Sequence, residues 1–212
     1  MNRGKRLSRA CILRLELYLD LLEQLREEDK RNVTSTEIGS ALGLDPVKVR
    51  QDLFGLGSAD GRPKIGYEVT HLIKMLRHLF DVDRIKPVCI VGCGNLGKAL
   101  AGSNIWNKAG YRLVAVFDND PELVGSELAG FHIRSIGEMF GVIKTEAVET
   151  AVITVPVKAA QDTADLLLAA GIKAIWNFTQ ANIQTPDDVI VENQFLAWGL
   201  ITLSHRVKWT QE

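Results

Sequence analysis

Apolar residues divide the 212-residue chain into two parts with different periodicity. Up to about residue 80 they recur every three or four positions, which is typical of amphipathic helices. From residue 87 onward, short runs of branched apolar residues alternate with helical stretches. A first helix is predicted over residues 10–28, and its inward side consists of Leu15, Leu19, Leu22 and Leu25.

Two further helices are predicted between residues 34 and 55, which makes a helix-turn-helix. Thr34 and Glu37 form a capping box, in which each side chain accepts a hydrogen bond from the other residue's backbone N–H. Gly43 ends this helix, because glycine readily adopts the left-handed conformation of a helix end. Asp45 caps the next helix, and Pro46 suits its first turn, where no N–H is required. The inward side of the earlier helix is expected to hold Ile38, Ala41 and Leu42.

The segment LGSADGRPKIGYEV after Gly55 predicts a β-hairpin. Glycines and Pro63 gather at its tip, and alternation resumes at Ile65, Tyr67 and Val69. A helix-turn-helix followed by a hairpin with a basic tip is a winged helix, and we expect this DNA-binding domain to cover residues 1–82. Residues 70–80 form a linking helix, and the domain boundary is expected between residues 81 and 87.

The rest of the chain predicts a Rossmann-type doubly wound parallel sheet over residues 83–193, so the fold class is α/β with an N-terminal winged helix-turn-helix domain. Helices are expected at residues 95–108 and 159–170, and a C-terminal helix lies within residues 194–212. The predicted strands are PVCIV (87–91), RLVAVF (112–117), TAVITV (150–155), KAIWNF (173–178) and DVIVE (188–192).

A glycine-rich loop, GCGNLG, joins the first of these strands to a helix. Gly92 allows a tight turn, Gly94 lets the backbone approach a pyrophosphate, and Gly97 lets the helix pack closely on the strand. Backbone N–H groups and the helix dipole would stabilise the phosphate charge. The candidate cofactor-binding residues of this loop are Gly92, Cys93, Gly94, Asn95, Leu96 and Gly97.

An acidic residue follows the next strand, 21 positions after Gly97. Asp118 would accept hydrogen bonds from the adenosine ribose hydroxyls and repel a 2′-phosphate, which favours NAD(H) over NADP(H). Asn119 is a neighbouring candidate, and Asp120 is an alternative ribose ligand. A glycine turn beside a surface aspartate, without a nucleotide, is the simpler alternative.

Two other strand ends lie where such sheets open onto their ligand crevice. We expect them to line the nicotinamide side of the cofactor, with a plain loop role as an equal alternative for each residue. These candidates are Thr154, Val155, Pro156, Asn177 and Phe178.

The third helix presents two sides on a helical wheel. Val49, Leu53 and Leu56 face the core, and Val47 lies on the outer side with the polar residues. In the major groove, arginine side chains on this outer side would favour guanine and glutamine side chains would favour adenine. The basic residues of the wing would reach phosphates or the minor groove. The alternative is that these residues are merely solvated surface charges. Because single winged helices bind DNA weakly, we expect a homodimer on palindromic operator DNA. The candidate DNA-binding residues are Lys48, Arg50, Gln51, Phe54, Arg62 and Lys64.

The charge distribution favours a polyanionic partner for the N-terminal part. Residues 1–80 hold 14 Lys and Arg against 11 Asp and Glu, a net charge of +3, whereas the remainder carries −4. No apolar run approaches the roughly 20 residues of a membrane span and no signal peptide is evident, so a cytoplasmic protein is expected. Cys11, Cys89 and Cys93 are too scattered for a disulfide framework or a zinc site, and no metal is expected.

The chain leaves little room for an oxidoreductase. A hydride-transfer enzyme needs a substrate pocket and usually a proton donor near the nicotinamide. Beside the Rossmann unit only the winged helix and a tail remain, and no tyrosine is followed four positions later by lysine. His205 is expected on the surface of the tail helix. The sequence therefore predicts a regulator with no catalytic residues.

These motifs together resemble the Rex family of redox-sensing transcriptional repressors over nearly the whole chain. The segment VRQDL, followed by a wing ending in GY, is similar to the family's recognition helix and wing. Four further segments of this chain resemble the family's cofactor domain: GCGNLGKAL, FDNDPELVG, TVP with AAQ, and AGIKAIWNF. The resemblance implies a homodimer with a swapped C-terminal helix. It also implies that operator DNA is bound with NAD+ or without ligand and is released when NADH binds.

Several positions depart from the Rex pattern. Gln51 stands where a lysine is common, the wing is one residue longer, and Thr179-Gln180 stand where Ala-Pro is usual. An arginine and an aspartate that pair differently in the two states of the family correspond to Asp20 and Phe195 here. Because this pair is absent here, the signal from the bound nucleotide to the DNA-binding domain is expected to pass through other contacts or to be weak. One hypothesis is that Phe195, or the leucine after it, inserts near the nicotinamide.

Three other functions stay open from the sequence alone. A small NAD-dependent oxidoreductase would turn over NADH with a small carbonyl compound. A module that senses CoA or another nucleotide could use the same fold, because a fold does not fix a function. An obligate partner subunit would bind no DNA. The predicted function is a repressor that senses the NADH/NAD+ ratio.

Overall fold

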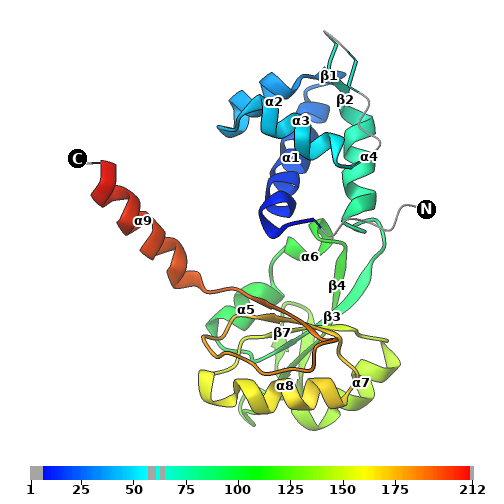
Figure 1. Ribbon diagram of the computed structural model, residues 1–212. Helices are drawn as coiled ribbons and strands as arrows, with labels where there is room; N and C mark the ends of the chain where they lie inside the picture. Colours follow the sequence, from blue (N-terminus) through cyan, green and yellow to red (C-terminus); the bar gives the residue numbers. More distant parts are fainter. Residues whose placement is uncertain (1–6, 57–60, 63–64, 211–212) are drawn as a thin grey trace. The chain divides into compact units, whose positions relative to one another are not determined.

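The computed structural model describes residues 7–56, 61–62 and 65–210 and divides into two compact units, residues 1–83 and residues 84–212 (Figure 1). The described residues of the N-terminal unit form one buried apolar cluster, and those of the C-terminal unit form two. None of the described helices is long and apolar enough to cross a membrane. In the same ranges, no three His, Cys, Asp or Glu side chains gather as a metal site would require.

The N-terminal unit is a small helical domain in which α1 packs along α4 and α2 packs against α3. Its described elements are α1 (Arg9–Glu27), β1 (Asn32–Val33), α2 (Ser35–Leu42), α3 (Pro46–Phe54), β2 (Tyr67–Glu68) and α4 (Val69–Leu79). Leu15 and Leu22 of α1 are fully buried, as are Val49 and Leu53 of α3, which confirms the inward faces predicted for these two helices. Leu19 is half-buried on the same side of α1.

The predicted helix ends of the helix-turn-helix are confirmed. The Thr34 hydroxyl accepts a hydrogen bond from the Glu37 N–H at 3.1 Å, and the Glu37 carboxylate accepts one from the Thr34 N–H at 2.7 Å. Gly43 adopts a left-handed φ of 66°, and the Asp45 carboxylate accepts from the Val47 N–H at 2.8 Å. These short-range bonds set where the helices begin and end.

One inward position predicted for α2 is wrong. Ala41 is exposed, and Gly39 is buried in its place next to Ile38. A Cβ on Gly39 would lie 2.6 Å from the carbonyl oxygen of Leu44 and 3.3 Å from the ring of Pro46. The turn into α3 therefore folds back onto α2 so tightly that only glycine fits there.

Only part of the predicted wing lies within the described residues. Arg62 and Gly66 form an antiparallel bridge with hydrogen bonds of 2.9 Å in both directions, while β2 pairs with β1 rather than within the hairpin. Val69 begins α4 instead of ending a strand, because its side chain joins the helical core. Pro63 and Lys64 lie outside the described residues.

The C-terminal unit contains a seven-stranded sheet with the order β5-β6-β4-β3-β7-β8-β9. All pairings are parallel except β5 with β6, so the predicted doubly wound parallel sheet is confirmed. The strands are β3 (Lys86–Val91), β4 (Tyr111–Asp118), β5 (Glu127–Leu128), β6 (Phe131–Ser135), β7 (Thr150–Ile153), β8 (Ala174–Asn177) and β9 (Ile190–Asn193). Sequence reasoning missed β5 and β6, since FHIRS contains no apolar run.

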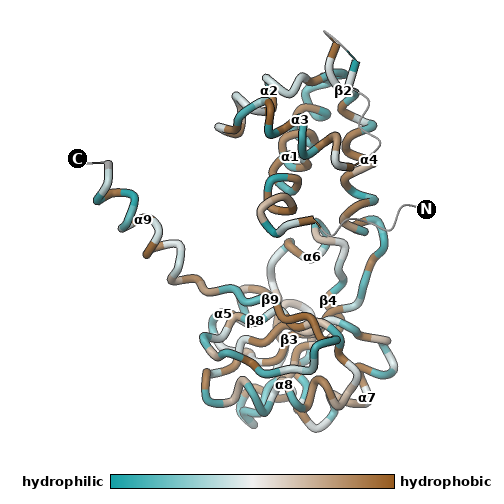
Figure 2. The backbone as a smooth tube through the Cα atoms, viewed as in Figure 1, coloured by the Kyte–Doolittle hydropathy of each residue, from teal (hydrophilic) through white to brown (hydrophobic). Residues whose placement is uncertain are grey.

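Helices cover both faces of this sheet. Buried side chains of α7 and α8 pack on one face, and those of α5 and α6 pack on the other, around strands that are strongly hydrophobic (Figures 1 and 2). The predicted helix over residues 95–108 is interrupted at residues 102–104 and forms two short helices. The described helices are α5 (Asn95–Ala101), α6 (Ile105–Lys108), α7 (Met139–Thr145), α8 (Ala160–Ala169) and α9 (Leu196–Thr210), with 3-10 turns at Ile136–Glu138 and Val157–Ala159.

Candidate nucleotide and DNA sites

The loop that follows β3 lies between the ends of β4 and β7. Val91 of β3 pairs with Phe117 of β4 and with Ile153 of β7, so the next residues stand at one level. The Gly92 N–H donates to the Phe117 carbonyl at 2.8 Å, and the Thr154 N–H donates to the Val91 carbonyl at 2.9 Å. This is the point where the strand order reverses, the usual ligand position in such sheets.

A pocket of about 430 Å³ opens at this edge, within the range of roughly 300–1,000 Å³ that is common for small-molecule sites. Seven residues predicted from the sequence line it: Gly92, Gly94, Asp118, Asn119, Thr154, Val155 and Pro156. Three lining residues were missed because small and apolar side chains form no motif: Ile136, Ala159 and Thr163. The pocket therefore gathers the glycine loop, the acid and the TVP segment.

The shape of the glycine loop is set by close backbone contacts. Gly92 has φ +104°, and a Cβ there would lie 2.8 Å from the carbonyl carbon of Thr154. A Cβ on Gly97 would lie 1.9 Å from the Gly92 oxygen, whereas one on Gly94 would meet no protein atom within 4 Å. The Thr154 hydroxyl donates to the Gly92 oxygen at 2.8 Å. The loop is thus closed against the protein and open at Gly94, which fits the approach of a pyrophosphate to the backbone.

Asp118 is buried at the end of β4 and lines the pocket. One carboxylate oxygen accepts from the Cys93 N–H at 2.5 Å and the other accepts from the Asp120 N–H at 2.9 Å. A carboxylate can accept about four hydrogen bonds, so acceptor capacity for ribose hydroxyls is left. Asp120 is exposed and caps the Glu122 N–H at 3.0 Å. The geometry favours Asp118 over Asp120 as the ribose ligand.

The other loop residues have different surroundings. Cys93 is fully buried, and its thiol donates to the Phe117 carbonyl at 3.6 Å. Burial, with the nearby Asp118 charge, raises the pKa of the Cys93 thiol to about 12, so it stays protonated and packs as a small apolar side chain. Asn95 is exposed and Leu96 is half-buried in the first turn of α5.

Asn177 lies in the joint between β8 and β9 rather than at the pocket. Its amide N–H groups donate to the Ala181 carbonyl at 3.0 Å and to the Asn193 side-chain oxygen at 2.7 Å. Its side-chain oxygen accepts from the Thr179 N–H at 2.9 Å and from the Thr179 hydroxyl at 2.7 Å. Because every polar atom of this buried amide has a protein partner, nothing is left for the nicotinamide.

Aromatic packing accounts for the position of Phe178. Its ring is half-buried and lies 4.4 Å from the Trp176 ring, which in turn meets Trp106 edge-on at 6.4 Å. Phe178 therefore contributes to the apolar face under α5 and α6. Phe195, the residue expected near the nicotinamide, directly precedes α9, and its ring lies 5.1 Å from the ring of Trp198 in that helix.

The outward side of α3 presents the residues predicted to contact DNA. Lys48, Arg50, Gln51 and Phe54 are all exposed, and Phe54 is the most exposed large apolar side chain described, at 84%. The basic and amide groups suit phosphates and base edges, and an apolar ring suits a thymine methyl group. One acid of α3 was missed as a buried residue: Asp52 is only 6% exposed and faces α1.

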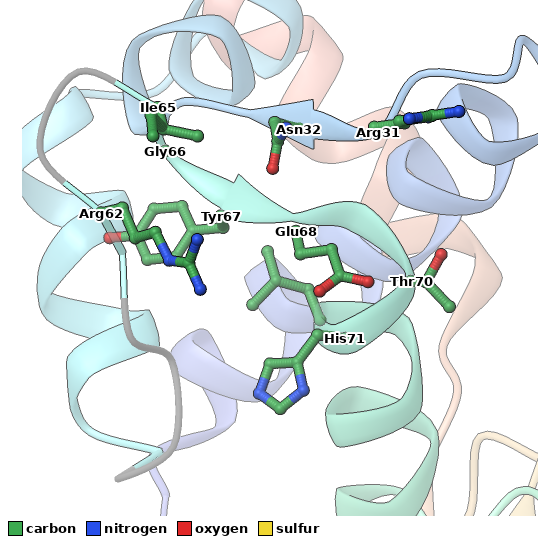
Figure 3. A pocket seen from close by; sticks show the side chains of 10 residues that line it. Arg31, Asn32, Arg62, Ile65, Gly66, Tyr67, Glu68, Thr70 and His71 are labelled. Atoms are coloured by element: carbon green, nitrogen blue, oxygen red, sulfur yellow. The ribbon is translucent and has the colours of Figure 1, made fainter.

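The described part of the wing borders a polar hollow of about 760 Å³. Figure 3 shows the Arg62 guanidinium over this hollow beside the Tyr67 ring, with Glu68 and His71 on its other side. A Cβ on Gly61 would lie 2.7 Å from the Tyr67 ring, so any other residue there would push this ring aside. The wing thus holds an exposed arginine next to β2.

Two family descriptions match the chain: "Putative DNA-binding protein N-terminus" at residues 6–53 and "CoA binding domain" at residues 83–181. The redox-sensing transcriptional repressor Rex of Caldicellulosiruptor saccharolyticus is 38% identical over 98% of this chain and 94% of its own length. Its counterpart from Thermoanaerobacter pseudethanolicus is 35% identical over 98% and 92%. This chain belongs to the Rex family of redox-sensing transcriptional repressors.

Solved Rex structures agree with this membership. The chain matches RSP, a Rex-family repressor, with a TM-score of 0.87 at 33% identity, covering 98% of this chain and 96% of that one. It matches RSP in complex with β-NAD+ and operator DNA with a TM-score of 0.90 at 34% identity over 98% and 95%. RSP has also been solved with β-NADH. The predicted membership of the Rex family is confirmed, and the relatives are named repressors rather than enzymes.

Proposed function

We propose that this Rex chain represses transcription by holding operator DNA with α3 and the wing, and that NADH in the cleft beside Asp118 releases it. The observation that supports this most directly is the presence of both parts in one chain: a glycine loop with an acid at the switch point, and an exposed basic helix in a separate unit. Operator binding would place the protein in the cytoplasm, with the chromosome.

The cleft suits a dinucleotide better than CoA, although the CoA binding domain family covers the same residues. CoA carries a phosphate on its adenosine ribose, which would bring a dianionic group next to the buried Asp118 carboxylate. Repulsion between like charges is strong where water is excluded. The ribose of NAD(H) instead offers two hydroxyl donors to this carboxylate. Asp118 therefore favours NAD(H).

Discrimination between NAD+ and NADH must come from the nicotinamide end, because the two forms share everything that the glycine loop and Asp118 contact. The nicotinamide ring of NAD+ is planar and positively charged, whereas the ring of NADH is uncharged and not strictly planar. Val155 and Pro156 at the pocket rim, together with the second copy of the chain, are our candidates for this contact. A ligand shifts a two-state equilibrium only by its differential affinity, and a complete switch needs roughly a 10⁴-fold preference.

The C-terminal helix supports a homodimer, in which two copies would bind the halves of a palindrome. Apolar side chains are exposed on more than one side of α9, and a helix that is hydrophobic all round is normally buried. We propose that α9 packs on a second copy of the chain. The exposed apolar residues of α9 are Leu196, Trp198, Leu200, Ile201, Leu203, Val207 and Trp209.

The same unit offers an apolar surface that could receive such a helix. A hollow of about 330 Å³ lies beside α6 and the starts of the central strands, and its lining includes Ile105, Trp106, Trp176 and Ile190. Ile190 is 66% exposed on the edge strand β9. Burying exposed apolar area of this kind stabilises an interface by roughly 25 cal/mol per Å². We therefore place the partner's α9 against this hollow.

The deciding experiment is a DNA-binding titration with both nucleotides side by side. The full chain first selects its operator from random duplexes, and fluorescence anisotropy then measures the affinity for that operator with NADH, NAD+ or CoA. We expect NADH to weaken binding at least 10-fold, while NAD+ and CoA do not. Operator affinity that is unchanged at saturating NADH would refute the proposed function.

A further inference from the structure

Asp52 is an acidic residue buried within the helix that faces DNA. Its side chain turns away from the outward residues of α3 and meets α1. The Arg14 guanidinium donates to both carboxylate oxygens, at 2.6 and 2.8 Å, and the Tyr18 hydroxyl donates to one of them at 3.1 Å. A buried charge is tolerated only when it is paired and hydrogen-bonded in this way.

The partners of Asp52 come from one stripe of α1. Cys11, Arg14 and Tyr18 are spaced by three and four residues, so they share one side of the helix. The Cys11 sulfur lies 3.7 Å from the carboxylate, and the Lys48 ammonium lies 3.6 Å from it on the DNA-facing side. Asp52 thus joins α1 to α3 through several directed contacts.

Asp52 is ionised in this arrangement. Burial opposes its charge, but the hydrogen bonds from Arg14 and Tyr18 outweigh burial and hold the pKa of Asp52 below its ordinary value. Burial and the same contact raise the pKa of Tyr18 to about 12, so its hydroxyl remains a donor. The carboxylate therefore stays negative although it lies beneath a surface that attracts phosphate.

We propose that Asp52 is a positioning residue for operator recognition: its fork with Arg14 fixes the rotation of α3 so that Arg50 and Gln51 meet base edges. This inference rests on the proposed function of α3 as the DNA-reading helix. With a helix radius of about 5–6 Å, a rotation of about 20° moves a surface group by about 2 Å. Such a shift exceeds the tolerance of a hydrogen bond to a base.

A simple charge effect and a positioning effect have opposite signs here. Neutralising an acid near DNA favours binding to any sequence, because fewer negative charges oppose the phosphates. Loss of positioning weakens the contacts that read bases and leaves the phosphate contacts largely in place. The informative readout is therefore the ratio of operator affinity to affinity for a scrambled duplex.

The test compares Asp52→Asn with Glu27→Gln, which neutralises an exposed acid at the end of α1. Anisotropy with the full chain and no nucleotide measures both affinities at two salt concentrations. We expect Asp52→Asn to reduce the operator-to-scrambled ratio at least 10-fold without weakening binding to the scrambled duplex, and Glu27→Gln to leave the ratio unchanged. The double variant Arg14→Gln/Asp52→Asn should regain part of the ratio, because two amides can hydrogen-bond without an unpaired buried charge.

Two further results protect the inference from a folding artefact. Tyr18→Phe deletes a single hydrogen bond, and we expect a 2- to 5-fold fall in the ratio with an unchanged far-ultraviolet circular dichroism spectrum of the full chain at the assay temperature. An Asp52→Asn ratio equal to or above that of the wild type would overturn the inference. So would equal loss on both duplexes combined with no effect of Tyr18→Phe. A wild type that discriminates between duplexes but ignores NADH would instead count against the proposed function.

Discussion

The Asp118 carboxylate and the Cys93 backbone N–H are joined by a hydrogen bond of 2.5 Å, which ties the end of β4 to the glycine loop after β3. The acid that would bind the ribose is therefore also a structural part of the loop that would bind the pyrophosphate. Both halves of the proposed adenosine diphosphate site are therefore tied together within the protein itself.

Replacement of Asp118 should weaken both redox forms of the nucleotide alike. Hydrogen bonds to a charged group contribute roughly 1.5–3 kcal/mol, so Asp118→Ala is expected to lower the affinity for NAD+ and for NADH by about 10- to 100-fold. Isothermal titration calorimetry measures this, with the exposed Asp120→Ala as the matched control. A selective loss of NADH alone would contradict the assignment of Asp118 to the shared ribose.

Two glycines of the loop should separate binding from stability. A Cβ on Gly97 would meet the Gly92 oxygen at 1.9 Å, so Gly97→Ala should lower the melting temperature of the Rossmann unit. Gly94→Ala meets no protein atom within 4 Å and should leave stability unchanged while reducing nucleotide affinity. Thermal melts and nucleotide titrations of the two variants test this. The reverse pattern would place the phosphate elsewhere.

Arg50 should matter for DNA and not for the nucleotide. Arg50→Ala is expected to lower operator affinity by about 10- to 100-fold, since a bidentate contact to a base contributes roughly 1–3 kcal/mol. NADH affinity should be unchanged, because Arg50 lies in the other unit. Lys74→Ala removes one positive charge from an exposed side chain of α4, as Arg50→Ala does from α3, and serves as the control. Intact operator binding by Arg50→Ala would disprove the assignment of α3.

Thr179 should stabilise the joint between β8 and β9. Its hydroxyl donates to the buried Asn177 amide oxygen, a bond that the Ala-Pro typical of Rex cannot make. Thr179→Ala is expected to cost about 1 kcal/mol and to lower the melting temperature by roughly 2–4 °C. Thr185→Ala, which replaces a half-buried threonine that is not a hydrogen-bond partner of Asn177, is the control. An unchanged melting temperature would mean that the bond contributes nothing net.

Glu37 should give the N-terminal unit a measurable acid dependence. Hydrogen bonds from Lys30 and from Thr34 lower the pKa of Glu37 to about 2. A carboxylate with a lowered folded-state pKa contributes stability above about pH 4.5, and this contribution is lost as the pH falls towards 2. Circular dichroism melts between pH 5 and pH 2.5 measure the slope. Glu37→Gln can keep the capping box but should flatten this part of the profile, by a small amount because the side chain is 47% exposed.

The sequence predicted best what depends on neighbours along the chain. The capping box of Thr34 and Glu37 spans three residues, and the glycine loop with its flanking strand and helix spans about a dozen, so local chemistry decides both. The doubly wound parallel sheet followed from the alternation of strands and helices along the chain. These features need no knowledge of distant contacts.

What the sequence did not predict depends on residues far apart in the chain. Asp52 and its partner Arg14 are 38 positions apart, and a helical wheel of α3 alone cannot show that a side chain of α1 pairs with the carboxylate. Asn177 ends a strand as a cofactor residue would, but Thr179, Ala181 and Asn193 take all of its hydrogen bonds. Such pairings become visible only when the packed structure is known.

The Thr154 hydroxyl donates a hydrogen bond to the Gly92 carbonyl, and this bond has a thermodynamic consequence. Because the turn is already formed, an arriving dinucleotide has little backbone to order, and binding avoids much of that entropic cost. NAD+ and NADH then compete for one preformed site, and their identical adenosine diphosphate halves gain the same from it. When NAD+ and NADH together saturate the site, the fraction of sites that holds NADH depends on the ratio of the two concentrations. That fraction does not change when both concentrations rise or fall together.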